Sequence, residues 1–153
     1  MFQRILVPTD GSSVSRNAAY AAIELAKVTG GSVITVHVVP PVSAEAMMDG
    51  VGSMALPANV EAHLGPNGDG VPVERDTALM DVESQARAAG VTITSERVAD
   101  FGAADAIMDF ATARQCDLIV MGAARYDALM ALVRGSTSQR VAAGSNCPVL
   151  LVH

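Results

Sequence analysis

Two glycine-containing segments in the last third of the chain have the residue types that hold a phosphate group. The first is Gly122, which directly follows the apolar run 118–121, and the second is the segment Gly135-Ser136-Thr137. A glycine lets the backbone approach an anion closely, and the N–H groups in the first turn of a helix bind negative charge. The two segments therefore predict an anion site between the end of a strand and the start of a helix.

A second polar segment, Pro8-Thr9-Asp10, follows the apolar run 5–7 near the start of the chain. In open α/β sheets, ligands bind beyond the carboxyl ends of the strands, where the winding direction reverses. We expect this segment and Gly122 to meet there. The carboxylate of Asp10 can accept hydrogen bonds from ribose hydroxyls, or it can instead cap the turn into the following helix.

The apolar pattern predicts strands that alternate with helices. We expect strands at 5–8, 32–39, 91–98, 118–121 and 148–152, and helices at about 15–28, 73–89, 103–115 and 137–143. Ser13 or Ser15 is expected to cap the first helix. This order predicts a single α/β domain over residues 1–153, with a doubly wound, mainly parallel five-stranded sheet and helices on both faces. Residues 42–72 break the pattern and are expected to form a flexible insertion, either lid-like or disordered.

Composition excludes several classes of protein. The net charge of −6 and an aromatic content of 3% argue against nucleic-acid binding, which uses basic patches and stacking side chains. No apolar run reaches the roughly 20 residues of a membrane helix, and no secretory signal pattern is present. With only two cysteines, we expect a cytoplasmic protein.

The reactive side chains are dispersed along the sequence. His37, His63 and His153 fall in separate segments, and no cluster has the spacing of metal ligands. We expect His37 to pack within its strand, and Cys116 and Cys147 to act as small buried hydrophobic residues. No catalytic residue and no metal ligand is predicted, which favours a binding protein over an enzyme.

Two signatures in the chain resemble those of the universal stress protein family. The matching segments are Val7-Pro8-Thr9-Asp10-Gly11-Ser12, Met121-Gly122, Gly135-Ser136 and Asn146-Cys147-Pro148-Val149-Leu150-Leu151-Val152. The resemblance covers essentially the whole chain and implies an adenine nucleotide α-hydrolase-like fold. It also implies a stress-responsive signalling protein that binds ATP, with Mg²⁺ held mainly by the phosphates, or that binds AMP or cyclic AMP instead. A slow ATP hydrolase, with Asp10 as its only candidate base, is the enzymatic alternative.

The resemblance assigns binding residues and leaves one alternative open. The implied nucleotide contacts are Pro8, Thr9, Asp10, Val38, Met121, Gly122, Arg125, Gly135, Ser136 and Thr137. Nucleotide-binding members of the family carry a Gly-x-x-Gly pair followed further on by Gly-Ser or Gly-Thr, and Arg125 takes the place of the middle glycine. If this position needs a positive φ, a residue other than glycine is strained there by about 1 kcal/mol or more. The Arg125 side chain then either keeps the loop from closing on the phosphates or donates hydrogen bonds to a phosphate.

The resemblance also implies partners. In the family, the C-terminal strand, here predicted at 148–152, pairs across a two-fold axis to form a homodimer. An apolar strand at the margin of a sheet invites such pairing. The alternative to the dimer is an edge covered by the insertion. The alternative to nucleotide binding is a family member that binds no nucleotide and works only through contacts with an unidentified protein partner.

Overall fold

The structure is a computed structural model that describes residues 2–39, 73–100, 102–123 and 137–153. Its elements are β1 (Arg4–Pro8), α1 (Ser13–Thr29), β2 (Ser32–Val39), α4 (Val73–Ala88), β3 (Thr92–Ala99), α5 (Ala103–Ala113), β4 (Leu118–Gly122), α6 (Thr137–Gly144) and β5 (Val149–Val152). The predicted strands and helices are confirmed, with ends that differ by one or two residues. The insertion predicted at 42–72 lies outside the described residues.

The five strands form one parallel sheet in the order β3-β2-β1-β4-β5. The chain builds β2 and β3 on one side of β1 and then returns to build β4 and β5 on the other side. The winding direction therefore reverses between β1 and β4, where Leu6 pairs with Ile119. This confirms the doubly wound sheet and places the carboxyl ends of β1 and β4 side by side.

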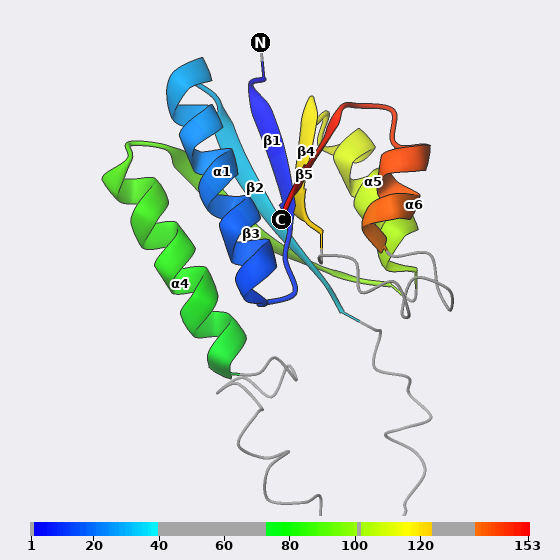
Figure 1. Ribbon diagram of the computed structural model, residues 1–153, viewed down its shortest axis with the longest axis horizontal. Coiled ribbons are helices and arrows are strands. Elements are labelled where there is room, and N and C mark those ends of the chain that lie inside the picture. Colours follow the sequence, from blue (N-terminus) through cyan, green and yellow to red (C-terminus); the bar gives the residue numbers. More distant parts are fainter. Residues whose placement is uncertain (1, 40–72, 101, 124–136) are drawn as a thin grey trace, which may run out of the picture.

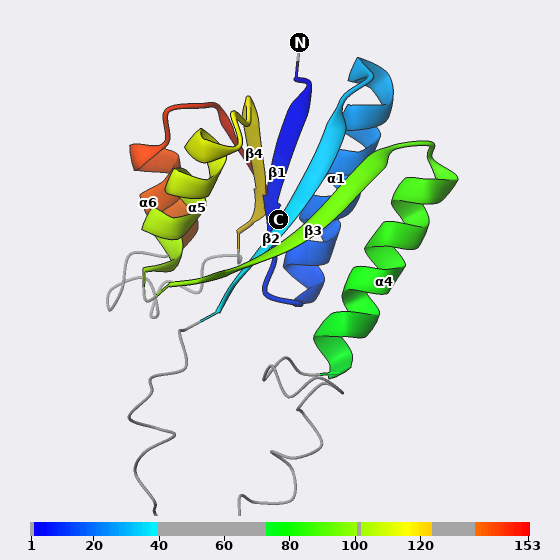
Figure 2. The ribbon, with the colours of Figure 1, turned by 180° about the vertical axis from the view of Figure 1, so that it is seen from behind.

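Helices cover both faces of the sheet, with α1 and α4 on one face and α5 and α6 on the other (Figures 1 and 2). Alternation along β1 explains the two layers, because Ile5 and Val7 join the core cluster under α1, whereas Leu6 joins the cluster under α5 and α6. All three side chains are fully buried. The central strands are thus fixed from both faces, and their ends are rigid supports for a site.

The start of α1 differs from the prediction, because Ser12 is its N-cap rather than Ser13 or Ser15. The Ser12 hydroxyl accepts the backbone N–H of Ser15 at 3.2 Å, so one otherwise unpaired donor of the first turn is satisfied. Along the helix, Ala18, Ala22 and other small residues are buried against the sheet. Their size lets α1 approach the strands closely.

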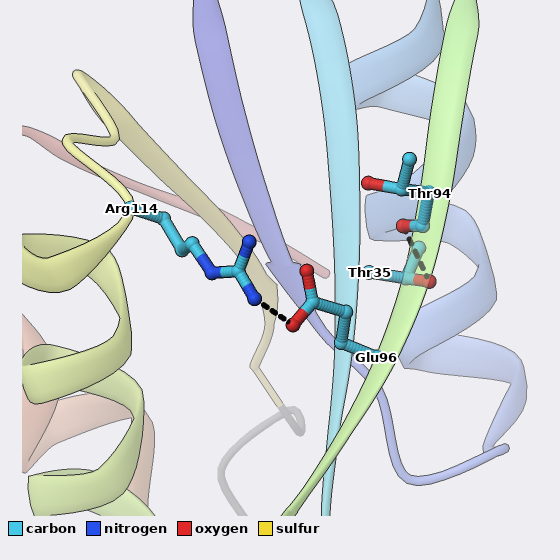
Figure 3. A network of polar contacts seen from close by, with 4 residues as sticks. All are labelled: Thr35, Thr94, Glu96 and Arg114. Carbon is cyan, nitrogen blue, oxygen red and sulfur yellow. Dashed lines mark hydrogen bonds and ion pairs between the residues drawn. The ribbon is translucent and has the colours of Figure 1, made fainter.

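The end of α5 also differs, because the helix ends at Ala113 and not at the predicted residue 115. Gln115 has a φ of 53°, a left-handed conformation that turns the chain toward β4. Arg114 lies at this end, and Figure 3 shows its side chain reaching across the sheet to form an ion pair with Glu96 on β3. Its guanidinium also lies 5.3 Å from the centre of the Phe110 ring. The ion pair with Glu96 ties the end of α5 to the sheet, whereas the ring contact lies within the end of α5 itself.

Polar contacts also join the edge strand β3 to its neighbour and to α4. The Thr35 hydroxyl on β2 lies 3.0 Å from the Ser95 hydroxyl and 3.5 Å from the Thr94 carbonyl oxygen (Figure 3). Ser95 in turn donates to the Glu83 carboxylate on α4 at 2.8 Å. Thr35 is only 2% exposed, so this series of hydrogen bonds gives a buried hydroxyl in the core its partners.

Both cysteines are free thiols. Cys116 is buried, as predicted, whereas Cys147 is only half-buried and its N–H donates to the Ser145 hydroxyl. Burial, and next the neighbouring Cys147, raise the pKa of the Cys116 thiol to about 11. Cys116 is therefore a neutral, unreactive thiol at neutral pH. Among the described helices, none has both the length and the apolar character needed to cross a membrane.

Candidate functional site

A pocket of about 440 Å³ opens at the carboxyl ends of β1, β2 and β4, beside the starts of three helices. It contains most of the residues predicted for the site, namely Pro8, Thr9, Asp10, Val38, Met121, Gly122 and Thr137. Arg125, Gly135 and Ser136 lie outside the described residues. The structure thus brings together two segments that are more than a hundred residues apart in the sequence.

Several lining residues are absent from the predicted set. They are Ser12, Val14 and Ser15 from α1 and its cap, Val36 from β2, and Ala103 and Ile107 from α5. Ser12 and Ser15 are typical helix-capping residues, so their positions in the sequence indicate the start of a helix and not a binding site. Only the packing of α5 over the sheet reveals Ile107 as a wall of the pocket.

One wall of the pocket is apolar. Val36 and Val38 extend from β2, and Ile107 and Met121 face the pocket from α5 and β4. Val36, Ile107 and Met121 are nearly inaccessible, whereas Val38 is half-buried at the mouth. Val39, the last residue of β2, is not among the residues that line the pocket. Such a surface suits a flat, uncharged ring.

A second wall of the pocket is built from hydroxyl groups around the start of α1. The Ser15 hydroxyl lies 3.3 Å from the Thr9 hydroxyl and 3.3 Å from the Ser12 hydroxyl, and it donates to the Ser12 carbonyl oxygen at 3.0 Å. Thr9 also accepts the N–H of Gly11 at 3.2 Å. These contacts hold the segment after β1 in one conformation.

Asp10 adds a negative charge to this wall. Its Oδ1 accepts the N–H of Ser12 at 2.9 Å, so the carboxylate takes part in the turn into α1. Burial acts to raise the pKa of Asp10, but hydrogen bonds from the Ser12 hydroxyl and N–H outweigh burial and hold that pKa below its ordinary value. Asp10 is therefore ionised at neutral pH and accepts hydrogen bonds only.

Gly122 has a packing role in addition to the anion-binding role that the sequence predicts for it. A Cβ at this position would lie 2.8 Å from the carbonyl carbon of Val14 and 2.9 Å from its oxygen. The end of β4 can approach the first turn of α1 only without a side chain. Gly122 is thus needed to form the junction between the two segments, whatever the pocket binds.

The start of α6 completes the described part of the pocket. Thr137 is the first residue of this helix and is exposed, whereas Ser138 is 9% exposed. Arg140 on α6 pairs with Asp105 on α5 at 2.9 Å and so fixes the two helices relative to each other. Among the described residues that line the pocket, Asp10 is the one that carries a charge.

The histidines do not form a site within the described part of the chain. His37 is half-buried on β2, and the Nδ1 of His153 lies 3.2 Å from the Ala123 carbonyl oxygen beyond β4. His63 lies outside the described residues. No group of three or more His, Cys, Asp or Glu side chains able to hold a metal ion occurs among the residues that the structure describes.

A pocket at the switch point of a doubly wound parallel sheet defines an α/β protein of the kind that binds small ligands beyond its strand ends. The model of the universal stress protein family matches residues 1–153. The chain belongs to the universal stress protein family.

Similar proteins support this assignment. A universal stress protein of Methanocaldococcus jannaschii is 34% identical over 99% of this chain and 82% of its own length. The crystal structure of a universal stress protein in complex with cAMP is 25% identical, with a TM-score of 0.73 over 99% of this chain and 97% of that one. A universal stress protein of Archaeoglobus fulgidus in complex with dAMP shares the fold at 21% identity, with a TM-score of 0.64 over 99% of this chain and 98% of that one.

Proposed function

We propose that this protein is a cytoplasmic, stress-responsive signalling protein that binds an adenine nucleotide in the pocket between β1 and β4. The observation that carries the proposal is the pairing of an apolar wall with a wall of hydroxyls and one carboxylate at the switch point. The similar universal stress protein in complex with cAMP supports it. The two free cysteines are in keeping with a reducing compartment.

We assign the parts of the nucleotide to the parts of the pocket. The adenine packs against Val38 and Met121, and the ribose hydroxyls donate to Asp10 and Thr9. The phosphates lie toward Thr137 and the preceding Gly135-Ser136 segment, where the helix start favours negative charge. Because Asp10 is the only carboxylate among the described lining residues, Mg²⁺ accompanying ATP would be held mainly by phosphate oxygens.

Calorimetric titration of nucleotide-stripped protein with ATP, AMP and cyclic AMP tests the proposal. We expect at least one of the three to bind and to raise the melting temperature at millimolar concentration. The absence of both heat and a melting shift with all three nucleotides would contradict the proposal.

Two variants of Arg125 decide between its two roles. Arg125→Gly restores the family's glycine, and Arg125→Ala removes the charge without adding backbone freedom. If the side chain blocks the phosphate loop, the glycine variant binds ATP more tightly than the alanine variant and the wild type. If the guanidinium binds a phosphate, both variants lose about tenfold or more in affinity.

We propose a binding role rather than catalysis. The low pKa of Asp10, set by Ser12, makes this carboxylate a weaker base than an ordinary aspartate. Steady release of phosphate from ATP that is lost in an Asp10→Asn variant would favour the slow hydrolase instead.

We further propose that β5 pairs with its copy in a homodimer. β5 is an edge strand of the sheet, and Leu150 in its centre is 40% exposed. Sedimentation of the wild type should give a dimer, and Leu150→Lys should shift it to monomer. Val28→Lys is the matched control, because Val28 is a more exposed apolar residue that lies on α1 and not on β5. A monomeric wild type at micromolar concentration would contradict the pairing.

A second candidate function has one observation in its favour, the arginine at position 125 in place of a glycine. If that side chain closes the loop to phosphates, the protein acts through contacts with an unidentified protein partner without bound nucleotide. The same titrations distinguish the two functions.

A further inference from the structure

Ser15 is a buried residue of the pocket to which the proposed function gives no role. It is 6% exposed and lies in the first turn of α1. Its hydroxyl is the point where three hydroxyl groups meet, those of Thr9, Ser12 and Ser15 itself. Its single proton and two lone pairs determine how these groups are oriented.

The protons of this cluster can be assigned by counting donors. The Ser15 hydroxyl has one proton, which it donates to the Ser12 carbonyl oxygen at 3.0 Å or to the Asp10 carboxylate, and in either case its oxygen can only accept at its remaining contacts. The contact between Ser15 and Thr9, at 3.3 Å, therefore needs its proton from Thr9. Thr9 donates to Ser15, and its own oxygen accepts the N–H of Gly11.

This assignment leaves only acceptors facing the ligand on this wall. Thr9 keeps one lone pair. The Ser12 hydroxyl donates its proton to Ser15 or to Asp10 and accepts the N–H of Ser15, so it also keeps one lone pair. Asp10 is ionised and cannot donate. A wall of this kind binds hydrogen-bond donors and disfavours a phosphate group, which itself only accepts at full ionisation.

We propose that Ser15 is a positioning residue that sets ligand specificity by holding the Thr9 hydroxyl as an acceptor. Through Thr9, it makes the wall select ligands with sugar hydroxyls and directs the phosphates to the opposite end of the pocket. The proposal rests on the proposed function, since it assumes that the pocket holds an adenine nucleotide. Ser15 acts through Thr9 rather than by contacting the reacting or charged part of the ligand.

The test compares AMP with 2′,3′-dideoxy-AMP, which lacks both sugar hydroxyl donors. We expect the wild type to bind AMP about tenfold more tightly than the dideoxy compound, because the dideoxy compound offers the acceptors of this wall no sugar hydroxyl donors. In Ser15→Ala, the Thr9 proton is released and this ratio should fall to about threefold or less. Ser15→Thr keeps the hydroxyl and should restore the ratio. Ser13→Ala is the matched control at an exposed serine of the same helix turn.

The outcomes separate this inference from the proposed function. If AMP does not bind to the wild type, the proposed function is wrong and the inference falls with it. If AMP binds but the two ligands bind equally, or if Ser15→Ala weakens both by the same factor, the inference alone is wrong. If Ser15→Ala does not fold, Ser15→Cys replaces it, since a thiol of similar size is only a weak hydrogen-bond acceptor and should lower the ratio in the same way.

Discussion

Two aspartates at opposite ends of the central strands have different roles in this protein. Asp117, at the amino end of β4, accepts the backbone N–H of Gln3 at 2.6 Å and that of Arg4 at 3.0 Å. Asp10, at the carboxyl end of β1, accepts the N–H of Ser12 and lines the pocket. An aspartate thus joins two backbone segments at one end of the sheet, and another aspartate lines the pocket at the other end. Its position relative to strand direction distinguishes the two roles.

The residues around the two aspartates also differ between the two ends of the sheet. At the amino end, Arg4 donates to the Arg114 carbonyl oxygen at 2.6 Å, so long charged side chains tie neighbouring segments together. At the carboxyl end, hydroxyls and a glycine make the contacts, and they leave a cavity between them. The amino end of the sheet is therefore a structural junction, and the carboxyl end holds the pocket that we propose for the ligand.

The largest expected effect comes from Gly122→Ala at the carboxyl end. The new Cβ would overlap the backbone of Val14, which cannot move aside without shifting α1. We expect a loss of about 1–3 kcal/mol in the free energy of unfolding, measured by denaturant titration. Gly144→Ala is the control, because its Cβ would meet only the flexible Met108 side chain, at 3.0 Å from the sulfur. An equal loss in both variants would show that Gly122 has no special packing role.

A smaller effect is expected from the two aspartates themselves. Asp117→Asn leaves a neutral side chain with a single acceptor oxygen for the N–H groups of Gln3 and Arg4. We expect a loss of about 1 kcal/mol in the free energy of unfolding and no change in AMP affinity. Asp10→Asn should do the reverse, with nearly unchanged stability and weaker AMP binding in calorimetry. If Asp117→Asn weakened AMP binding, or if Asp10→Asn mainly lowered the free energy of unfolding, the two ends of the sheet would not have these separate roles.

The smallest expected effect is the contribution of Asp10 to the pH dependence of the free energy of unfolding in acid. Its pKa is lower in the folded protein than its ordinary value of 3.8, so its contribution is present above that pH. The contribution is lost as the pH falls below 3.8 through the folded-state pKa. Because Asp10 is largely exposed, we expect well under 1 kcal/mol. Chemical denaturation of wild type and Asp10→Asn between about pH 6 and pH 3 should show curves that converge at acid pH. A constant separation would contradict the prediction.

Much of the fold could be predicted because its signals are local. Runs of β-branched residues such as 33–36 gave the strands, and alanine spacing in 18–26 gave the first helix. The choice of N-cap could not be predicted, since Ser12, Ser13 and Ser15 are all suitable capping residues. The structure selects Ser12 because the turn from Asp10 already fixes the backbone before it.

The site was predictable only where a residue's own type carried the chemistry. Asp10 and Thr9 stand after a strand, so their position at its carboxyl end follows from the sequence. The role of Gly122 depends on Val14, which is distant in the sequence, and that of Ser15 depends on a proton count across three side chains. Such roles arise from tertiary contacts that no local pattern contains.

The pairing of β1 with β4 determines when this protein can finish folding. β1 lies at the centre of the sheet, yet one of its neighbours is β4, and the Gln3–Asp117 contact beside that pairing spans 114 residues of chain. During synthesis, β1 can pair with β2 early, but its other edge stays open until β4 has left the ribosome. Contacts of such long range slow folding and leave an apolar strand edge exposed meanwhile. This edge of β1 therefore stays uncovered until residues 118–122 pair with it, and only β5 then remains to be added to the sheet.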